Sequence, residues 1–208
     1  MRGGDDTGDA DASVRRDSSA GGDSSNIVVD APPGPCTPMT KNLLRNGNFE
    51  TTPAGTDWNA TPISATYPIV TADAGGVAAQ SPTYRAWMAG LEESATINKD
   101  VMYQDVTVPP GTTKLELKGF YDLRTGEIGT NVYDRATVEL TSTTNTQLEL
   151  VKALDDNGAT TAWTAFNKLF TGDYSGMTVR LRFSTASDSL DATSFFFDTL
   201  ELNATFCQ

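Results

Sequence analysis

Residues 177–184 read Met-Thr-Val-Arg-Leu-Arg-Phe-Ser, and this stretch decides the fold class. Its apolar side chains stand at every second position, with Thr, Arg, Arg and Ser between them or after them. A period of two places the apolar side chains on one face of an extended strand and the polar ones on the other. The stretch therefore predicts a strand of an antiparallel sheet with one face buried and one in solvent.

The same alternation recurs toward the N-terminus. The alternating apolar positions are Val106 and Val108, Leu115 and Leu117, and Ala136, Val138 and Leu140. Residues rich in Pro, Gly, Asp and Asn, which favour turns, separate these runs at 109–111, 155–158 and 172–176. Several short strands joined by turns, with no helical repeat, predict an all-β sandwich or barrel.

Two further segments are predicted to be strands. Residues 194–206 are apolar on both faces at Phe195–Phe197, which predicts a central strand. Residues 161–170 contain Ala and Lys and resemble a short helix, but Trp163, Ala165 and Leu169 keep the period of two. We interpret this segment as a strand.

Several motifs resemble the galactose-binding-like jelly rolls of carbohydrate-binding modules and of accessory domains in secreted bacterial peptidases. The first is residues 42–50, where Asn-Gly-Asn-Phe-Glu ends at Glu50 and leads on to Trp58. The later pieces are, in order, residues 87–90, 103–109, Glu127, Asp134, Trp163, 175–183 and 193–200. Together they resemble the domain that accompanies immune-inhibitor-type metallopeptidases, over about residues 42–206. The resemblance implies a non-catalytic antiparallel β-sandwich with a jelly-roll topology.

The resemblance also implies a structural calcium ion. It places the first and last strand motifs side by side, so Glu50 and Asp198 would be carboxylate ligands, and backbone carbonyls around Asn48 would complete the shell of six to eight oxygens. One departure weakens the site: Thr199 stands where the family has a second acidic residue. The alternative is that Glu50 and Asp198 are exposed carboxylates at strand ends.

Glu127 and Asp134 lie in a polar loop and leave three interpretations open. They pair with Arg124 or Arg135, they bind a second cation, or they act as acid and base in glycoside cleavage. The last would need a raised pKa and a substrate cleft, and the sequence indicates neither.

A glycan-binding surface is expected to carry exposed aromatic rings with polar neighbours. Tyr84 and Tyr133 have such neighbours, and with Glu127 and Asp134 they form the predicted ligand-binding set. Trp87, Trp163 and Phe183 are predicted to lie in the core, where large aromatic side chains fill the space between two sheets.

Cys36 and Cys207 are the two cysteines of the chain and lie 171 residues apart, a spacing that matches no metal or redox motif. We predict a disulfide between them, worth about 4 to 5 kcal/mol for so long a loop, and with it an oxidising compartment. The alternative is two unrelated buried thiols.

The chain contains no histidine, which removes the commonest general base and the commonest zinc ligand.

Charge and composition limit the classes of partner that we expect, and they predict how the chain is divided into domains. The formal net charge of −12 disfavours nucleic acid, and no apolar run is long enough for a transmembrane helix. Residues 1–35 hold seven Asp, three Arg and no aromatic residue, which predicts a disordered acidic arm before a sandwich domain at 36–208. The arm is either a tether or a tail without a role. The sequence shows no export signal, so we expect one to be removed or to lie upstream.

These features lead to a secreted or surface-exposed binding module, not an enzyme. The first hypothesis is recognition of a glycan or cell-surface polysaccharide, with a structural calcium. The alternative is a structural or adhesion domain with a protein partner, and a minor alternative is a glycoside-active enzyme that uses Glu127 and Asp134.

Overall fold

The computed structural model describes residues 36–72, 76–91, 99–188 and 190–207. The predicted arm at 1–35 lies outside the described residues. The strands are β1 (Pro38–Asn42), β2 (Asn59–Thr61), β3 (Val70–Thr71), β4 (Arg85–Ala89), β5 (Val101–Thr107), β6 (Thr112–Thr125), β7 (Arg135–Thr141), β8 (Gln147–Asp155), β9 (Thr164–Leu169), β10 (Thr178–Ala186) and β11 (Thr193–Cys207). In the described part of the chain, no helix is long and apolar enough to cross a membrane.

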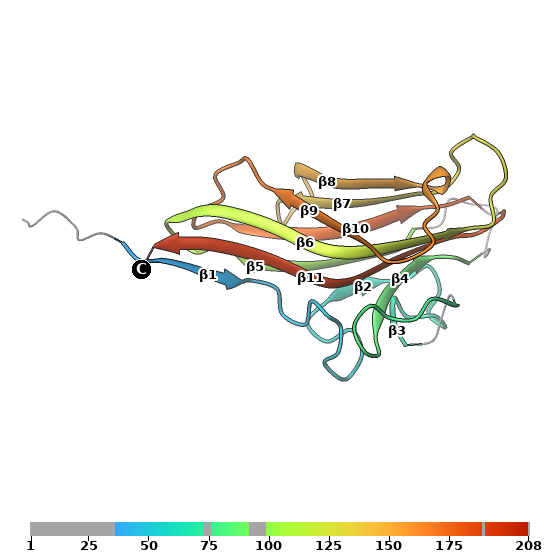
Figure 1. Cartoon of the computed structure of the whole chain (residues 1–208), viewed down its shortest axis with the longest axis horizontal. Coiled ribbons are helices and arrows are strands. Elements are labelled where there is room, and N and C mark those ends of the chain that lie inside the picture. The colour runs from blue at the N-terminus through green and yellow to red at the C-terminus, as the bar shows by residue number, and fades with distance from the viewer. Residues whose placement is uncertain (1–35, 73–75, 92–98, 189, 208) are drawn as a thin grey trace, which may run out of the picture. The chain divides into compact units, whose positions relative to one another are not determined.

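The strands form two antiparallel sheets (Figure 1). The six-stranded sheet has the order β3-β4-β11-β6-β9, with β1 paired to β11, and the five-stranded sheet has the order β2-β5-β10-β7-β8. The predicted all-β antiparallel sandwich is therefore confirmed.

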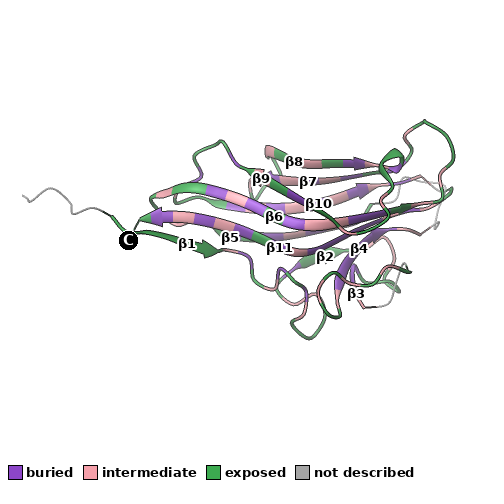
Figure 2. Ribbon diagram, in the orientation of Figure 1, coloured by how far each residue is buried: buried purple, intermediate pink, exposed green. Residues whose placement is uncertain are grey.

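The core lies between the two sheets, and the alternation read from the sequence decides which side chains enter it. Val179, Leu181 and Phe183 of β10 are fully buried, whereas the residues between them, Arg180 and Arg182, are only half-buried. In the other sheet, β6 and β11 also alternate between buried and more exposed residues (Figure 2). The Phe183 ring meets Phe197 of β11 at 4.9 Å between centroids, so this pair joins the sheets. Met177 is the exception: it is 45% exposed in the turn before β10, so its predicted place in the core was wrong.

β11 is the central strand that its sequence predicts. It pairs with β4 on one side and with β6 on the other, and Phe195, Phe196 and Phe197 are all fully buried. The Phe196 ring is covered by the guanidinium of Arg85, 5.5 Å from the ring centroid. Both faces of β11 are thus shielded from solvent at Phe195–Phe197.

β9 is a strand as predicted, but its faces are inverted. Phe166 and Phe170 are buried, whereas Ala165 and Leu169 are exposed. Gly119 pairs with Phe166 across β6 and β9, and a side chain on Gly119 would lie 3.1 Å from the Phe166 ring. The glycine leaves room for the larger ring, which buries more apolar surface than Ala165 would.

Two more predictions concern the ends of the sandwich. Cys36 and Cys207 form the predicted disulfide with 5.4 Å between their Cα atoms, beside the β1–β11 pairing. Trp163 is half-buried before β9, and its Nε1 donates a hydrogen bond to the Ala78 carbonyl. The prediction of a core position for Trp163 was therefore wrong, because the edge of the sheet beside it is only partly covered.

Candidate functional site

The bend at residues 46–50 is fixed against β11 by backbone contacts. Gly47 accepts a hydrogen bond of 2.8 Å from the Leu200 amide, and a Cβ at Gly47 would overlap the Leu200 carbonyl oxygen. The Trp58 indole donates to the Asn46 carbonyl at 2.9 Å. Only glycine fits at this close approach, which brings the first motif of the chain beside the last.

Five oxygen atoms surround the hydroxyl of Ser81. The distances from Ser81 Oγ are 2.9 Å to the Asn48 carbonyl, 3.1 Å to Glu50 Oε1, 3.4 Å to the Tyr84 carbonyl, and 3.0 and 3.1 Å to the two carboxylate oxygens of Asp198. A hydroxyl carries one proton and can satisfy one of these acceptors. We call this group the Ser81 cluster.

Backbone amides add to the Ser81 cluster. Glu50 Oε1 accepts from the amides of Thr83 and Tyr84 at 3.0 and 2.8 Å, and Asp198 Oδ2 accepts from the amide of Ser81 at 2.8 Å. Desolvation acts to raise the pKa of Glu50, but these hydrogen bonds outweigh it and hold that pKa below its usual value. Burial raises the pKa of Asp198, which is fully buried.

Thr199 shapes the cluster without joining it as an acid. Its backbone is left-handed, with φ of 51°, at a β-bulge between Asp198 and Glu201. Its hydroxyl donates to the side-chain oxygen of Gln80, so the contact is a neutral hydrogen bond. Where the resemblance expects a second carboxylate, this chain therefore has a hydroxyl that is hydrogen-bonded to Gln80.

A second acidic group lies at the β6–β7 loop. Glu127 and Asp134, both singled out from the sequence, meet Asp156, with carboxylate oxygens of the three within 4.8 Å of one another. Arg124 does not pair with them, because its guanidinium binds Asp122 at 2.7 Å. Asp156 was missed; the only signal was the turn sequence at 155–158.

Of the predicted ligand-binding residues, Glu127 and Asp134 lie together with Tyr133 next to Asp134, whereas Tyr84 lies beside Glu50. Tyr133 is 43% exposed, and its hydroxyl accepts from the Asn131 side chain at 3.0 Å. Tyr84 is half-buried against the core. Asp134 is fully buried, and its two oxygens accept from the amides of Asp188 and Thr193, so it does not present a carboxylate to a substrate cleft.

The outer face of the five-stranded sheet carries a polar platform that the sequence analysis missed. The Arg180 guanidinium stacks on the Tyr103 ring, 3.7 Å from its centroid, and makes two hydrogen bonds to Asp105 at 2.7 and 3.0 Å. Beside it, Arg182 bonds to Glu139 at 3.3 Å and to Ser184 at 3.1 Å. The available signal was the polar half of the alternation in β5 and β10.

Cross-strand register holds this platform together. Tyr103 lies opposite Arg182 on β10 and opposite Asn59 on β2, and Arg182 lies opposite Glu139 on β7. A hollow of 260 Å³ continues along the same strands, and its lining includes Val101, Arg182 and Ser184. We call this surface the Tyr103 face.

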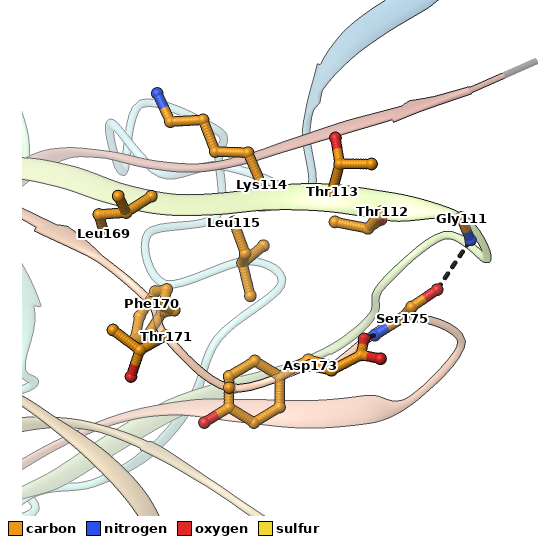
Figure 3. Close-up of a pocket in the computed structure, with 12 residues that line it drawn as sticks. Gly111, Thr112, Thr113, Lys114, Leu115, Leu169, Phe170, Thr171, Asp173 and Ser175 are labelled. Atoms are coloured by element: carbon orange, nitrogen blue, oxygen red, sulfur yellow. Dashed lines mark hydrogen bonds between the residues drawn. The ribbon is translucent and has the colours of Figure 1, made fainter. Parts of the chain in front are cut away.

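Among the further hollows in the described residues, two are lined by loop segments as well as by strands. The larger, of 730 Å³, is formed by the β5–β6 turn and residues 169–175; Figure 3 shows Leu115 pointing into it and Lys114 pointing away. The other, of 380 Å³, is lined in part by Trp163, Asp122 and Arg124. A further hollow, of 390 Å³, also combines aromatic rings with polar groups of adjacent strands, among them Phe166, Lys118 and Glu201. The Tyr103 face differs from these hollows in its stack of Arg180 on Tyr103.

The sequence matches no protein-family model and no curated protein. Its structure is similar to a family 61 carbohydrate-binding module solved with β-1,4-galactotriose, with a TM-score of 0.51 and 15% identity, over 81% of this chain and 99% of that one. The fold is a galactose-binding-like jelly roll. A family 16 carbohydrate-binding module (TM-score 0.45, 20% identity, 77% and 99% covered) and a xylan-binding family 22 domain from Paenibacillus barcinonensis (TM-score 0.41, 14% identity, 82% and 94% covered) are also similar to this jelly roll.

Proposed function

We propose that this jelly roll is a non-catalytic glycan-binding module whose ligand lies on the Tyr103 face. The observation that carries the proposal is the stack of Arg180 on Tyr103 with its paired Asp105, on an outer face. Aromatic rings contact the C–H faces of sugars, and planar charged groups hydrogen-bond adjacent hydroxyls in pairs. The fold shared with a module solved with galactotriose supports the same function.

The charges of the Tyr103 face favour a neutral sugar. Arg180 is paired with Asp105, and Arg182 with Glu139, so these two cations have carboxylate partners, while Lys99 and Arg135 line the adjoining hollow. The two ion pairs therefore offer directional hydrogen bonds and add little net charge at Tyr103. An uncharged oligosaccharide such as a β-1,4-galactan fragment is the first ligand to test.

A calcium ion at the Ser81 cluster is the second part of the proposal. Ligands 2.3 to 2.6 Å from calcium lie about 2.8 to 3.7 Å from one another, which is the range of spacings around Ser81 Oγ. The donors are carboxylates, carbonyls and a hydroxyl, which suit calcium better than zinc. The ion would hold the 46–50 bend and the 80–84 segment against β11.

Export to an oxidising compartment completes the proposal. The Cys36–Cys207 disulfide supports it, because such bonds persist in secreted and surface proteins. The association with a peptidase remains a prediction.

A glycan array with the intact chain tests the proposed function. We expect binding to neutral oligosaccharides, and binding that is insensitive to salt because the platform charges are paired. Binding to no glycan on an array that includes galactan, xylan and mannan fragments would contradict the proposal.

A protein partner is the second candidate function. Ile128 is 91% exposed and Leu190 is 68% exposed, and they lie on two different loops. A hydrogen bond of 3.2 Å from the Gly126 amide to the Ala192 carbonyl joins these loops. Exposed apolar side chains on adjoining loops are typical of a protein contact. A negative glycan array would favour this candidate.

A further inference from the structure

The acidic group of Glu127, Asp134 and Asp156 is built from two separate segments. Glu127 and Asp134 stand at the two ends of the loop between β6 and β7, and Asp156 follows β8 in a short 3₁₀ turn, η2 (Asp156–Gly158). Backbone bonds fix the arrangement: the Asp156 amide donates to the Asp134 carbonyl at 3.3 Å, and the Asp134 amide donates to Asp156 Oδ2 at 3.2 Å. The three carboxylates are thus held close by the fold itself.

These carboxylates are removed from solvent. Asp134 is fully buried and Asp156 is 4% exposed, while Glu127 is half-buried. Buried carboxylates close together repel, and burying a charge without a partner of opposite sign costs several kcal/mol. The arrangement is unfavourable unless a proton or a cation is added.

Two carboxylate oxygens in the group have no protein donor. Among the described residues, Asp156 Oδ1 and Glu127 Oε1 are buried and make no hydrogen bond. The other oxygen of Asp156 accepts from the amides of Tyr133 and Asp134, so the side chain is held in place beside the other two carboxylates while Oδ1 has no donor. Buried acceptors without donors are rare in folded proteins and call for a ligand.

The surrounding charges are negative as well. The carboxylates of Asp134, Asp156, Asp188 and Asp191 all lie close enough to Glu127 to repel its negative charge. Asp134 holds the neighbouring loop directly, because its oxygens accept from the amides of Asp188 at 3.0 Å and Thr193 at 3.1 Å. The electrostatic potential at the group therefore attracts a cation.

We propose that Glu127, Asp134 and Asp156 bind a calcium ion, separate from the one proposed at the Ser81 cluster. The ligands are hard carboxylate oxygens from irregular segments, which suit the flexible coordination of calcium. The ion connects the β6–β7 loop and the turn after β8, and through Asp134 it steadies the loop before β11. The proposal depends neither on glycan binding nor on the Ser81 cluster.

Calcium stoichiometry of the full chain tests this site. After removal of metal with a chelator, calcium binding is measured by isothermal titration in wild type, Asp156→Asn and Glu127→Gln. Each variant is expected to bind one calcium ion fewer than wild type, or to bind it at least 100-fold more weakly. Asp173→Asn, which changes an exposed carboxylate elsewhere, is the matched control and is expected to bind as wild type does.

Thermal melts without calcium separate binding from mere structural damage. Asn at position 156 can still accept from Tyr133 and Asp134, and its amide group can donate to the carboxylates, so Asp156→Asn is expected to melt several degrees higher than wild type in chelator. In the presence of calcium, wild type is expected to melt at a higher temperature than Asp156→Asn. If Asp156→Asn does not unfold cooperatively, Glu127→Gln decides the question. The proposal is overturned if the stoichiometry and affinity of the folded variants equal those of wild type.

Discussion

The outer faces of the two sheets differ in what lies over them. On the six-stranded sheet, Arg85, Phe196 and Asp198 are at most 1% exposed. On the five-stranded sheet, Tyr103 and Arg182 stay half-exposed and Asp105 is exposed. At these positions the six-stranded sheet holds loops of the protein itself, whereas the five-stranded sheet leaves polar side chains in contact with solvent. We call the two outer faces the closed face and the open face.

The difference between the faces comes from the chain connections. The segments before β4 bring Glu50 and Ser81 to Asp198, where the Ser81 cluster forms. On the corresponding face of β5 and β10, Arg180 bonds to Asp105 across the strands and to Asn145 of the β7–β8 turn. Substitutions on the closed face should therefore affect stability, and substitutions on the open face should affect binding.

The largest expected effect comes from the disulfide beside β1, at the edge of the closed-face sheet. Replacing both cysteines, with Cys36→Ser and Cys207→Ser, should lower the free energy of unfolding by about 4 kcal/mol, because the unfolded chain regains a loop of 171 residues. Urea unfolding of the variant and the oxidised wild type measures the loss. Equal midpoints would show that the disulfide adds nothing to the closed face.

The Ser81 cluster gives the next largest effect. Calcium at a hundredfold excess over Kd stabilises a protein by about 2.7 kcal/mol per site, so the Tm of wild type should rise by roughly 5 to 10 °C per site. In Asp198→Asn the rise should be smaller by this amount, whereas Arg180→Lys on the open face should retain it. A calcium response in Asp198→Asn that equals that of wild type would contradict the calcium site at the closed face.

Glu149 joins the two sheets at one end, and its effect depends on pH. Burial acts to raise the pKa of Glu149, but the amides of Gly172 and Thr171, with Lys168 and Tyr174, lower it from 4.5 to about 2. The folded pKa is below the unfolded one, so this stabilisation is complete above pH 4.5 and is lost as the pH falls to about 2. After solvent screening it amounts to about 2 kcal/mol.

Glu149→Gln is the variant that isolates this contribution. The difference in unfolding free energy between wild type and Glu149→Gln should be about 2 kcal/mol at pH 6 and should shrink toward zero by about pH 2. Asp173→Asn serves as the control at an exposed carboxylate. A difference that does not change with pH would mean that the charge of Glu149 is not what its partners stabilise.

Much of the fold follows from local alternation, and the wrong predictions of which side chains face the core have a common cause. Val179, Leu181 and Phe183 enter the core as the period of two predicts, because each has polar neighbours. In β9 the alternation was ambiguous, since Ala165 and Phe166 are both apolar. Gly119, 47 residues earlier in the chain, decides which of them faces inward, and no local pattern carries that information.

The residues of the candidate sites also include some that the sequence predicted and some that it did not. The resemblance predicted that Glu50 and Asp198 lie side by side, and carboxylate oxygens of both lie within 3.1 Å of Ser81 Oγ. Ser81 itself was not predictable, because it lies in a segment without periodicity. Asp156 was read only as a turn residue, and the Tyr103 face required the register between β5 and β10, which sequence alone did not supply.

The smallest expected free-energy effect is also the most direct test of function. Tyr103→Ala should weaken binding of a glycan identified on the array at least tenfold, about 1.4 kcal/mol, because a sugar would lose its aromatic contact on the open face. Isothermal titration should be run on Tyr103→Ala, Tyr133→Ala and Trp163→Ala, with the Tm of each checked against wild type. The account predicts that only Tyr103→Ala loses affinity while all three remain folded; unchanged affinity in Tyr103→Ala, or a loss in Tyr133→Ala or Trp163→Ala instead, would contradict it.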